Sequence, residues 1–153
     1  MMKKIIKFSI FLIFVFIFLA ANTHQETNFP KITFPYYPEI AAQNGDVVVS
    51  FSGYRNIDKW NQFLANINAQ KKDKVRVTSY TVEGSPIFHE LIYNGNIIQY
   101  IFDNSLDGFG LYAGRPKFIC EQIDVIESDG HQYYTLANCD KDIGVRFVFP
   151  VGL

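Results

Sequence analysis

The sequence predicts an α+β domain, in which one amphipathic helix packs on a mostly antiparallel meander sheet and one hairpin carries a disulfide. Apolar residues recur at helical spacing only in residues 57–67, whereas the later chain consists of short apolar runs separated by turn pairs. Aliphatic and aromatic residues make up 48% of the chain and charged residues 19%, which indicates a packed core rather than a disordered chain.

Residues 1–21 have the pattern of a secretory signal. Lys3, Lys4 and Lys7 precede an apolar run over residues 8–21, and a polar stretch follows. The alternative is an uncleaved membrane anchor, although a helix of about 14 residues spans about 21 Å of a hydrocarbon core of about 30 Å. We therefore expect a secreted or cell-surface protein that meets a membrane only through this segment, if the segment is retained.

The charge balance argues against nucleic acid as a partner. The chain has 14 Lys and Arg against 15 Asp and Glu; three lysines belong to the signal, which leaves 11 against 15, or −4, after it. Nucleic-acid binders need clustered positive charge, and the sequence has no basic stripe. It also contains no nucleotide-binding or metal-binding motif, so no cofactor is predicted.

After the signal, residues 22–38 are expected to form a linker or a surface arm, and residues 39–153 a single domain. Proline favours extended backbone at the residue before it. Three such pairs occur in this segment: Phe29-Pro30, Phe34-Pro35 and Tyr37-Pro38. Residues 39–44 are expected to make a short helical turn that Gly45 ends, because glycine tolerates the left-handed conformation after a helix.

The domain proper is expected to begin with a strand over residues 46–51 and a helix over residues 57–67 that Asn56 caps. Strands then follow around two tight-turn pairs, at residues 84–85 and 94–95. The two turns predict registers that place Tyr80, His89 and Tyr100 in one row across the sheet. Both faces of this sheet are apolar enough to need a cover, and the helix can cover only one. The whole is expected to be a curved sheet of about six or seven strands.

Cys120 and Cys139 are predicted to form a structural disulfide. Asp129 and Gly130 favour a two-residue hairpin turn, because both residue types tolerate positive φ. The two cysteines are equally distant from this turn, so they are expected to face each other across the hairpin. Outside the cytoplasm thiols oxidise, and closing a loop of about 20 residues contributes about 3 kcal/mol. A last strand is expected at residues 145–149.

Several stretches resemble one protein family. They are residues 44–48, 74–88, 93–95 and 100–105. They are similar to an uncharacterised family of exported proteins of Gram-positive bacteria, known as domain-of-unknown-function family 4362. The resemblance runs from about residue 38 to the C-terminus, but this chain lacks the lipidated cysteine of many members. It implies export and a shared fold, and it carries no activity and no catalytic residue. The expected architecture is also similar to cystatin-like folds, which does not by itself imply a function.

His89 is the strongest candidate for a functional side chain in the expected sheet. With Tyr80 and Tyr100 beside it, and Arg76 and Tyr93 further along the same face, it would bind an anionic or aromatic ligand or act as a base. The alternative is a half-buried histidine that a tyrosine hydroxyl satisfies.

A second candidate site is the loop that begins at Asp103. Asp103, Ser105 and Asp107 occupy the first three ligand positions of a calcium-binding loop, but Gly114 stands where that loop needs a glutamate. The alternative is an ordinary turn, which these residue types also favour. No metal site is predicted.

The sequence therefore favours an exported, non-catalytic module that binds a protein, a peptide or an envelope component at the bacterial cell envelope or exterior. An apolar, tyrosine-rich second face and the aromatic–proline arm favour binding, and no catalytic motif is present. The alternative function is a small extracytoplasmic hydrolase or transferase that uses His89 with Tyr80 or Tyr100.

Overall fold

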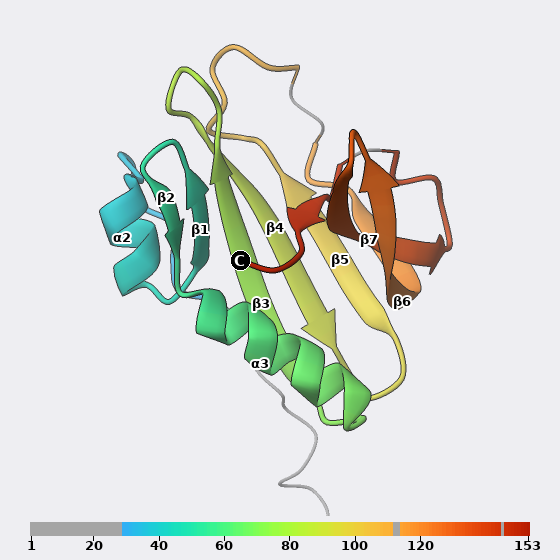
Figure 1. The fold of residues 1–153 in the computed structure, drawn as a ribbon. Helices are drawn as coiled ribbons and strands as arrows, with labels where there is room; N and C mark the ends of the chain where they lie inside the picture. Colours follow the sequence, from blue (N-terminus) through green and yellow to red (C-terminus); the bar gives the residue numbers. More distant parts are fainter. Residues whose placement is uncertain (1–28, 112–113, 145) are drawn as a thin grey trace, which may run out of the picture.

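The computed structural model describes residues 29–111, 114–144 and 146–153. The expected signal at residues 1–21 lies outside the described residues. Within them, an extended arm of residues 29–37 precedes the first helix (Figure 1). The elements then follow in the order α2 (Pro38–Gln43), β1 (Val47–Ser50), β2 (Gly53–Arg55), α3 (Ile57–Asn68), β3 (Asp73–Tyr80), β4 (Pro86–Tyr93), β5 (Ile98–Asp103), β6 (Lys117–Ser128), β7 (His131–Cys139) and β8 (Phe149–Pro150).

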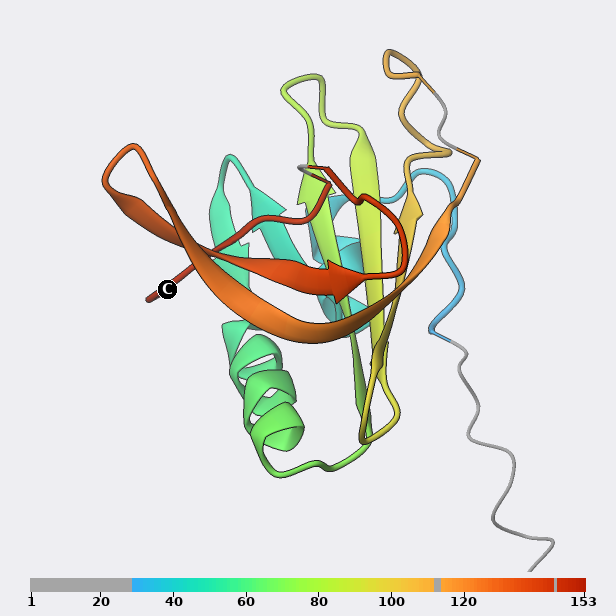
Figure 2. The same cartoon turned by 90° about the vertical axis from the view of Figure 1, so that its right-hand side faces the viewer.

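The predicted fold class is wrong. The described residues form one eight-stranded sheet, in the order β2-β1-β3-β4-β5-β6-β7-β8, and only two short helices. The sheet curls into a half-barrel, as Figure 2 shows, so the protein is mostly sheet and not an α+β domain of the cystatin-like kind. The sheet is also not a simple meander, because β1 pairs in parallel with β3 after a connection through β2 and α3.

The sheet curls because its C-terminal part covers the face that one helix cannot cover. α3 has 12 residues and is about 18 Å long, whereas β6 alone has 12 residues and runs for about 40 Å. Trp60 of α3 packs against Phe147 and Phe149, with ring centroids 5.8 and 4.7 Å apart. We call the face under α3 and this C-terminal segment the inner face, and the face under α2 and the arm the outer face.

Each face has its own hydrophobic cluster, and the two differ in size. The cluster of the inner face is the main core, built around Trp60 and Phe63 of α3. The cluster of the outer face is small and consists of Tyr36, Ala41, Val48 and Phe88 with a few half-buried neighbours. The arm is therefore packed against the domain at Tyr36, and it is not a free linker over the described residues.

The expected register between β3 and β4 is wrong. Residues 81–85 form a longer loop, closed by the Thr81 N–H donating to the Ser85 carbonyl at 2.9 Å. Tyr80 therefore pairs with Pro86 and not with His89, a shift of three residues. An odd shift exchanges the faces of a strand, so Tyr80 lies on the outer face and His89 on the inner face.

The expected register between β4 and β5 is also wrong, but by an even number of residues. The side chain of Asn94 accepts hydrogen bonds from the N–H groups of Asn96 and Ile97, which widens the turn. His89 therefore pairs with Phe102 and not with Tyr100, a shift of two residues. An even shift keeps the face, so His89 and Tyr100 remain on the same side of the sheet.

The predicted disulfide hairpin is confirmed. Cys120 and Cys139 are bonded, and they are direct partners in the ladder of β6 and β7. Asp129 and Gly130 form the two-residue turn with φ of 52° and 75°, the left-handed values that this turn requires.

The ends of the two helices lie near their expected positions, but the capping mechanism of the second differs. Gly45, with φ of 86°, follows α2, and Asn56 precedes α3. Asn56 makes no cap hydrogen bond; its side-chain amide donates to the carbonyls of Ala42 at 2.9 Å and Asp46 at 2.7 Å. It therefore fastens the end of α2 to the start of β1. Neither helix of the described chain has the length and apolar composition needed to cross a membrane.

The expected strand over residues 145–149 is shorter in the structure. The only strand there is β8, Phe149–Pro150, which pairs with Tyr133 and Tyr134 of β7. Residue 145 lies outside the described residues.

Candidate functional site

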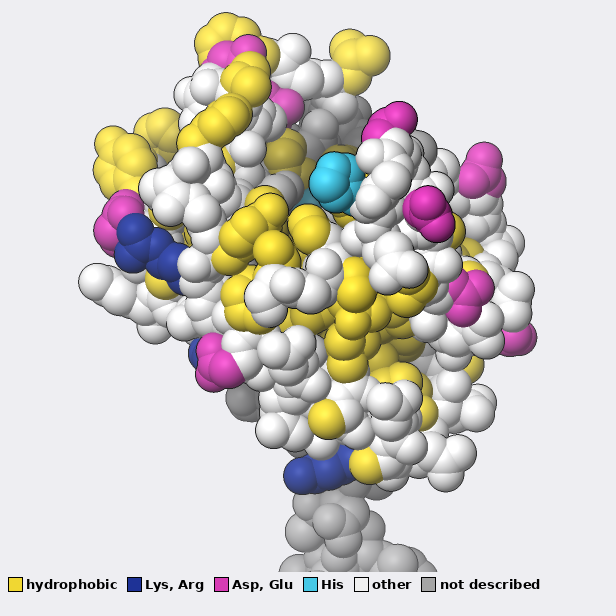
Figure 3. Space-filling model, viewed as in Figure 1, with side chains coloured by type: hydrophobic (Ala, Val, Ile, Leu, Met, Phe, Trp, Pro, Cys, Tyr) yellow, Lys and Arg dark blue, Asp and Glu magenta, His cyan; other side chains and the backbone are white. Residues whose placement is uncertain are grey.

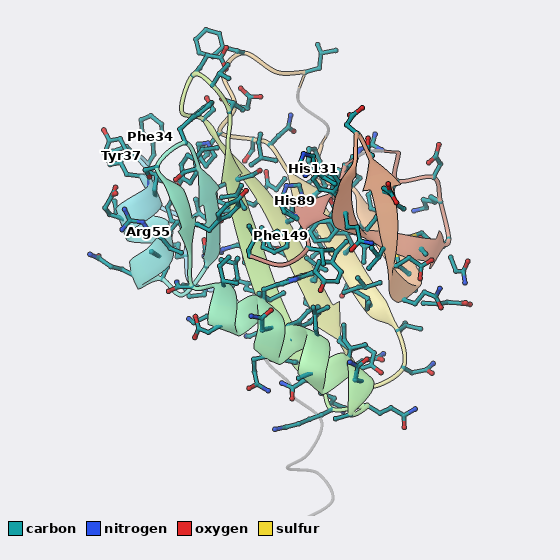
Figure 4. The ribbon with its side chains drawn as sticks, in the orientation of Figure 1. Phe34, Tyr37, Arg55, His89, His131 and Phe149 are labelled. Carbon is teal, nitrogen blue, oxygen red and sulfur yellow. A yellow bond between two sulfur atoms is a disulfide. The ribbon has the colours of Figure 1, made fainter. Side chains whose placement is uncertain are left out.

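Two polar clusters lie on opposite faces of the sheet, and β4 contributes neighbouring residues to them. His89 points to the inner face and is 8% exposed, while Glu90 points to the outer face and is 4% exposed. Figure 4 labels His89 near Phe149 of the C-terminal segment, whereas Phe34, Tyr37 and Arg55 lie around α2 and β2, away from His89. Each cluster borders a cavity, so we consider them in turn.

The inner cluster is a chain of hydrogen bonds through His89. The Nδ1 atom of His89 lies 3.0 Å from the Tyr100 hydroxyl, and the Nε2 atom lies 3.3 Å from the Ser79 hydroxyl. Tyr100 in turn donates its proton to the carbonyl of Arg146 at 3.3 Å. If the tyrosine donates there, Nδ1–H of His89 donates to it, and Nε2 accepts from Ser79.

Burial determines the charge of the inner cluster. It lowers the pKa of His89 to about 4, so the imidazole is neutral at pH 7, and it raises the pKa of the Tyr100 hydroxyl. The cavity beside His89, which we call the inner groove, has a volume of about 440 Å³. Its lining is mostly apolar: Val49, Val77, Ser79, Ile87, His89, Phe102, Arg146, Phe147, Val148 and Phe149.

The outer cluster is built on a buried ion pair between Arg76 and Asp46. The Nε–Oδ1 distance is 2.8 Å, and the two side chains are 1% and 2% exposed. Arg76 also donates to the Tyr36 hydroxyl and to the Pro30 carbonyl, both at 2.9 Å. All three guanidinium nitrogens of Arg76 therefore have partners, and two of these partners belong to the arm. Arg76 holds the arm on the sheet.

A second guanidinium, that of Arg115, completes the outer cluster at its solvent side. It lies 2.6 Å from the Glu90 carboxylate and 3.0 Å from that of Asp103, and its own side chain is 45% exposed. Burial raises the pKa of Glu90, while Arg115 and Arg76 act to lower it. The two buried acids thus hold one half-exposed cation in a fixed position.

The cavity beside Arg115, which we call the arm cleft, lies between the arm and the start of β6. Its volume is about 470 Å³. Its floor combines the apolar Ile92 and Ile101 with the amide of Gln99, and the arm and β6 supply the walls. The lining residues are Phe29, Pro30, Lys31, Ile32, Arg76, Glu90, Ile92, Gln99, Ile101, Arg115 and Lys117.

The five residues expected to share one binding face are divided between the two faces. His89 and Tyr100 are in contact on the inner face, where Tyr93 is part of the main core and only 5% exposed. Tyr80 lies on the outer face and donates its hydroxyl to the Tyr36 carbonyl at 2.9 Å, and burial raises its pKa. Arg76 lies on the outer face as well. The structure brings together His89 and Tyr100, and separately Arg76 and Tyr80 with the arm.

The residues of the candidate calcium loop have other partners. Asp103 accepts a hydrogen bond from the N–H of Ser105 at 2.9 Å and pairs with Arg115, and Asp107 accepts from the N–H of Phe109 at 3.1 Å. These are the bonds of ordinary aspartate turns. In the part of the chain that the structure describes, no group of three or more His, Cys, Asp or Glu could hold a metal ion.

Three members of these clusters are not predicted from the sequence: Asp46, Arg115 and Ser79. Asp46 meets Arg76, 30 residues later, because β1 and β3 are parallel neighbours, and a parallel pair was not predicted. Ser79 meets His89 only in the observed register. The feature that could have indicated this contact is the length of the loop at residues 81–85, because it determines whether Tyr80 or Ser79 lies beside His89.

Comparison with known proteins identifies the class of this protein. The family model described as "Domain of unknown function (DUF4362)" matches residues 44–135, more than half of the chain. The chain therefore belongs to this family of uncharacterised domains. The matched range includes the residues that β3 and β4 contribute to both polar clusters, but neither the arm nor the C-terminal segment. No curated protein and no solved structure gives a significant match.

Proposed function

We propose that this protein is an exported, non-catalytic binding module of the cell envelope or exterior, and that its ligand occupies the arm cleft. The signal pattern of residues 1–21 and the disulfide hairpin support export, because disulfides persist in oxidising compartments. The ligand is a peptide or protein segment that carries a carboxylate next to an apolar side chain.

The observation that carries this proposal is the position of Arg115 at the edge of the arm cleft. Glu90 and Asp103 fix its guanidinium at 2.6 and 3.0 Å, while 45% of the side chain still faces solvent. A guanidinium fixed in this way loses little entropy when it binds an anion. Exposed Lys31 and Lys117 add positive charge on both walls, and Ile92 and Ile101 offer an apolar floor.

The alternative function, a hydrolase or transferase based on His89, has less support. Tyr80 is on the other face, and an imidazole whose pKa is about 4 is a weak base at neutral pH. The geometry that favours it is the contact between His89 and Ser79, a nucleophile and a base at 3.3 Å. It predicts slow hydrolysis of p-nitrophenyl acetate that both Ser79→Ala and His89→Gln abolish, and equal rates in the variants and the wild type would exclude it.

Binding in the arm cleft can be tested by NMR titration with a defined probe. The probe is acetyl-leucyl-aspartate, and its control is the uncharged analogue with both carboxylates amidated. We expect the carboxylate probe alone to shift the side-chain resonances of Gln99 and Arg115. The double variant Lys31→Gln/Lys117→Gln leaves the ion pairs of Arg115 intact and should weaken binding about two- to tenfold.

The matched control is Lys71→Gln/Lys72→Gln, which removes two exposed lysines that do not line the cleft and should leave binding unchanged. Equal binding of the charged and uncharged probes would contradict an anion site. Equal weakening in both double variants would show that only the net charge of the protein matters.

A further inference from the structure

The β6–β7 hairpin leaves the sheet soon after its disulfide, and this exposes one edge of β6. β5 pairs only with residues 117–120 of β6, whereas β6 continues to Ser128. The ladder with β7 is interrupted at Glu121, opposite Asn138, whose φ of 52° bends the partner strand. Residues 121–128, which we call the free edge, therefore have a neighbouring strand on one side only.

The backbone of the free edge is available for pairing. A two-residue turn makes Ser128 and His131 a hydrogen-bonded pair, so the N–H and C=O groups of every second residue point away from β7. These residues are Ile123, Val125 and Glu127. No other described segment pairs with them or donates a backbone hydrogen bond to them. Eight residues in extended form offer a template about 27 Å long.

The surface beside the free edge is apolar. Leu64 and Ile67 of α3 and Ile123 of β6 are only partly buried where they pack on the main core. Figure 3 shows hydrophobic side chains in the hollow between α3 and the hairpin. On the hairpin itself, Val125 is 51% exposed and Ile126 is 41% exposed. A strand added here would find apolar contacts as well as backbone partners.

The negative charge of the hairpin indicates the charge that a partner strand should carry. Residues 119–142 contain six acidic residues and one lysine, Lys141. Glu121, Asp124 and Glu127 lie on the free edge, and none of them forms an ion pair with a described residue. Figure 3 shows acidic side chains over the part of the surface that the hairpin occupies. This part of the chain is negative, whereas the arm cleft carries an excess of positive charge.

A second copy of the protein is a poor partner for this edge. In the antiparallel register that places Asp124 opposite its own copy, Glu121 also faces Glu127, and like charges directly across a ladder are destabilising. Charges on an edge strand are a known protection against self-association. The same charges attract a strand of the opposite sign.

We propose that the free edge of β6 binds an extended, lysine- or arginine-rich protein segment, which adds to the sheet as a ninth strand. The segment alternates basic and apolar residues, so that its cations lie on the face of Asp124 while its apolar side chains pack against Ile123 and Val125 on the other face, towards the hollow beside α3. A basic residue at the end of the segment meets Glu127. This interaction surface is separate from the arm cleft and does not depend on it.

The test uses the intact protein and three capped peptides of equal length. The first alternates lysine and valine, the second alternates glutamate and valine, and the third is the lysine peptide with alternate backbone nitrogens methylated. We expect the first to bind, and to slow hydrogen exchange at the amides of Ile123, Val125 and Glu127. The methylated peptide keeps its charge but loses backbone donors, so it should bind at least about fivefold more weakly.

Two variants connect the binding to this edge. Val125→Pro removes an outward N–H without removing a bond to β7, and it should weaken the lysine peptide about fivefold. Asp124→Asn/Glu127→Gln should weaken it about two- to tenfold, while Glu83→Gln, an exposed acid on another loop, should have no effect. A thermal melt of each variant verifies that it is folded.

Equal binding of the methylated and unmethylated peptides would overturn strand addition, and equal binding of the glutamate peptide would overturn the choice of partner. A stable dimer in sedimentation experiments that Val125→Pro dissociates would also overturn the proposal, because the edge would then pair with itself.

Discussion

His89 and Glu90 are neighbours on β4, but their surroundings differ: the inner groove keeps His89 neutral, whereas the arm cleft places Glu90 between charged groups. The inner groove keeps its histidine neutral, and hydroxyl groups of Ser79 and Tyr100 satisfy both ring nitrogens. The arm cleft surrounds its glutamate with two guanidinium groups, at 2.6 and 3.7 Å. One side of the sheet is thus a packed interior with a polar chain through it, and the other is an ionic surface partly covered by the arm.

This difference indicates which face of the sheet is better suited to bind a ligand. A neutral buried histidine mainly supports packing, since it lies within 6 Å of the rings of Phe102 and Phe147. A charged cluster with one half-exposed member can exchange its water for a ligand without moving its buried members. If the comparison is right, the outer cluster should dominate stability at neutral pH, and the inner cluster should determine how stability responds to acid.

The largest effect is expected from breaking the buried ion pair of the outer cluster. Asp46→Asn leaves the buried guanidinium of Arg76 with Glu90, at 3.7 Å, as its only carboxylate partner among the described residues, and should lower the free energy of unfolding by about 3–5 kcal/mol. Urea denaturation measures this loss. The matched control is Glu39→Gln, which breaks the exposed pair with Arg55 and should cost about 1 kcal/mol or less. Similar losses in the two variants would remove the distinction between a buried network and a surface pair.

The next effect concerns His89 and pH. Its pKa in the folded state, about 4, lies below the ordinary value of 6.5, so the unfolded chain binds the proton more readily between these values. The stability that the neutral histidine permits is therefore present above pH 6.5 and is lost as the pH falls towards 4, by up to about 3 kcal/mol. The stability advantage of the wild type over His89→Gln should shrink by this amount over that range.

The comparison of wild type and variant isolates the histidine from Glu90. The raised pKa of Glu90 acts in the opposite direction, because its contribution is present at low pH and is lost as the pH rises through the folded-state pKa. A wild-type profile parallel to that of His89→Gln would show that His89 is accessible to protons without unfolding.

The smallest effect is expected within the arm, where adjacent aromatic residues differ in role. Tyr36→Phe removes the hydroxyl that donates to Asp46 at 2.8 Å and accepts from Arg76, and should cost about 1–3 kcal/mol. Phe34→Ser changes a ring that is 84% exposed and should change stability by about 0.5 kcal/mol or less. Urea denaturation of both variants, side by side, provides the check. A large loss from Phe34→Ser would mean that the arm is held by apolar packing and not by the ionic cluster.

The local features of the fold could be predicted from the sequence, and the long-range ones could not. The helix after Asn56 and the turn at Asp129 and Gly130 follow from patterns within about a dozen residues, and both are confirmed. The sheet order and the half-barrel depend on contacts between distant segments, such as Trp60 with Phe149. Such contacts leave no periodic signal, so the predicted fold class was wrong.

The predicted grouping of the site residues was wrong mainly because the length of one turn was wrong. A two-residue turn at Gly84 and Ser85 would have put Tyr80 beside His89, but the loop begins at Thr81, whose hydroxyl accepts a hydrogen bond from the Ser85 N–H at 3.2 Å. The resulting odd shift moved Tyr80 and Arg76 to the face opposite His89. Glycine–serine pairs fit both loop lengths, and only the packing of β3 against its neighbours selects between them.

The disulfide lies where the β6–β7 hairpin departs from the rest of the sheet, and its Cys120 is the last residue of β6 that pairs with β5. A covalent bond, and not only a few hydrogen bonds, therefore prevents β6 and β7 from separating at the base of the hairpin. The tip of the hairpin can therefore open or twist while β6 and β7 stay joined at its base. Reduction of the bond would leave only the hydrogen bonds of the ladder to hold β6 and β7 together.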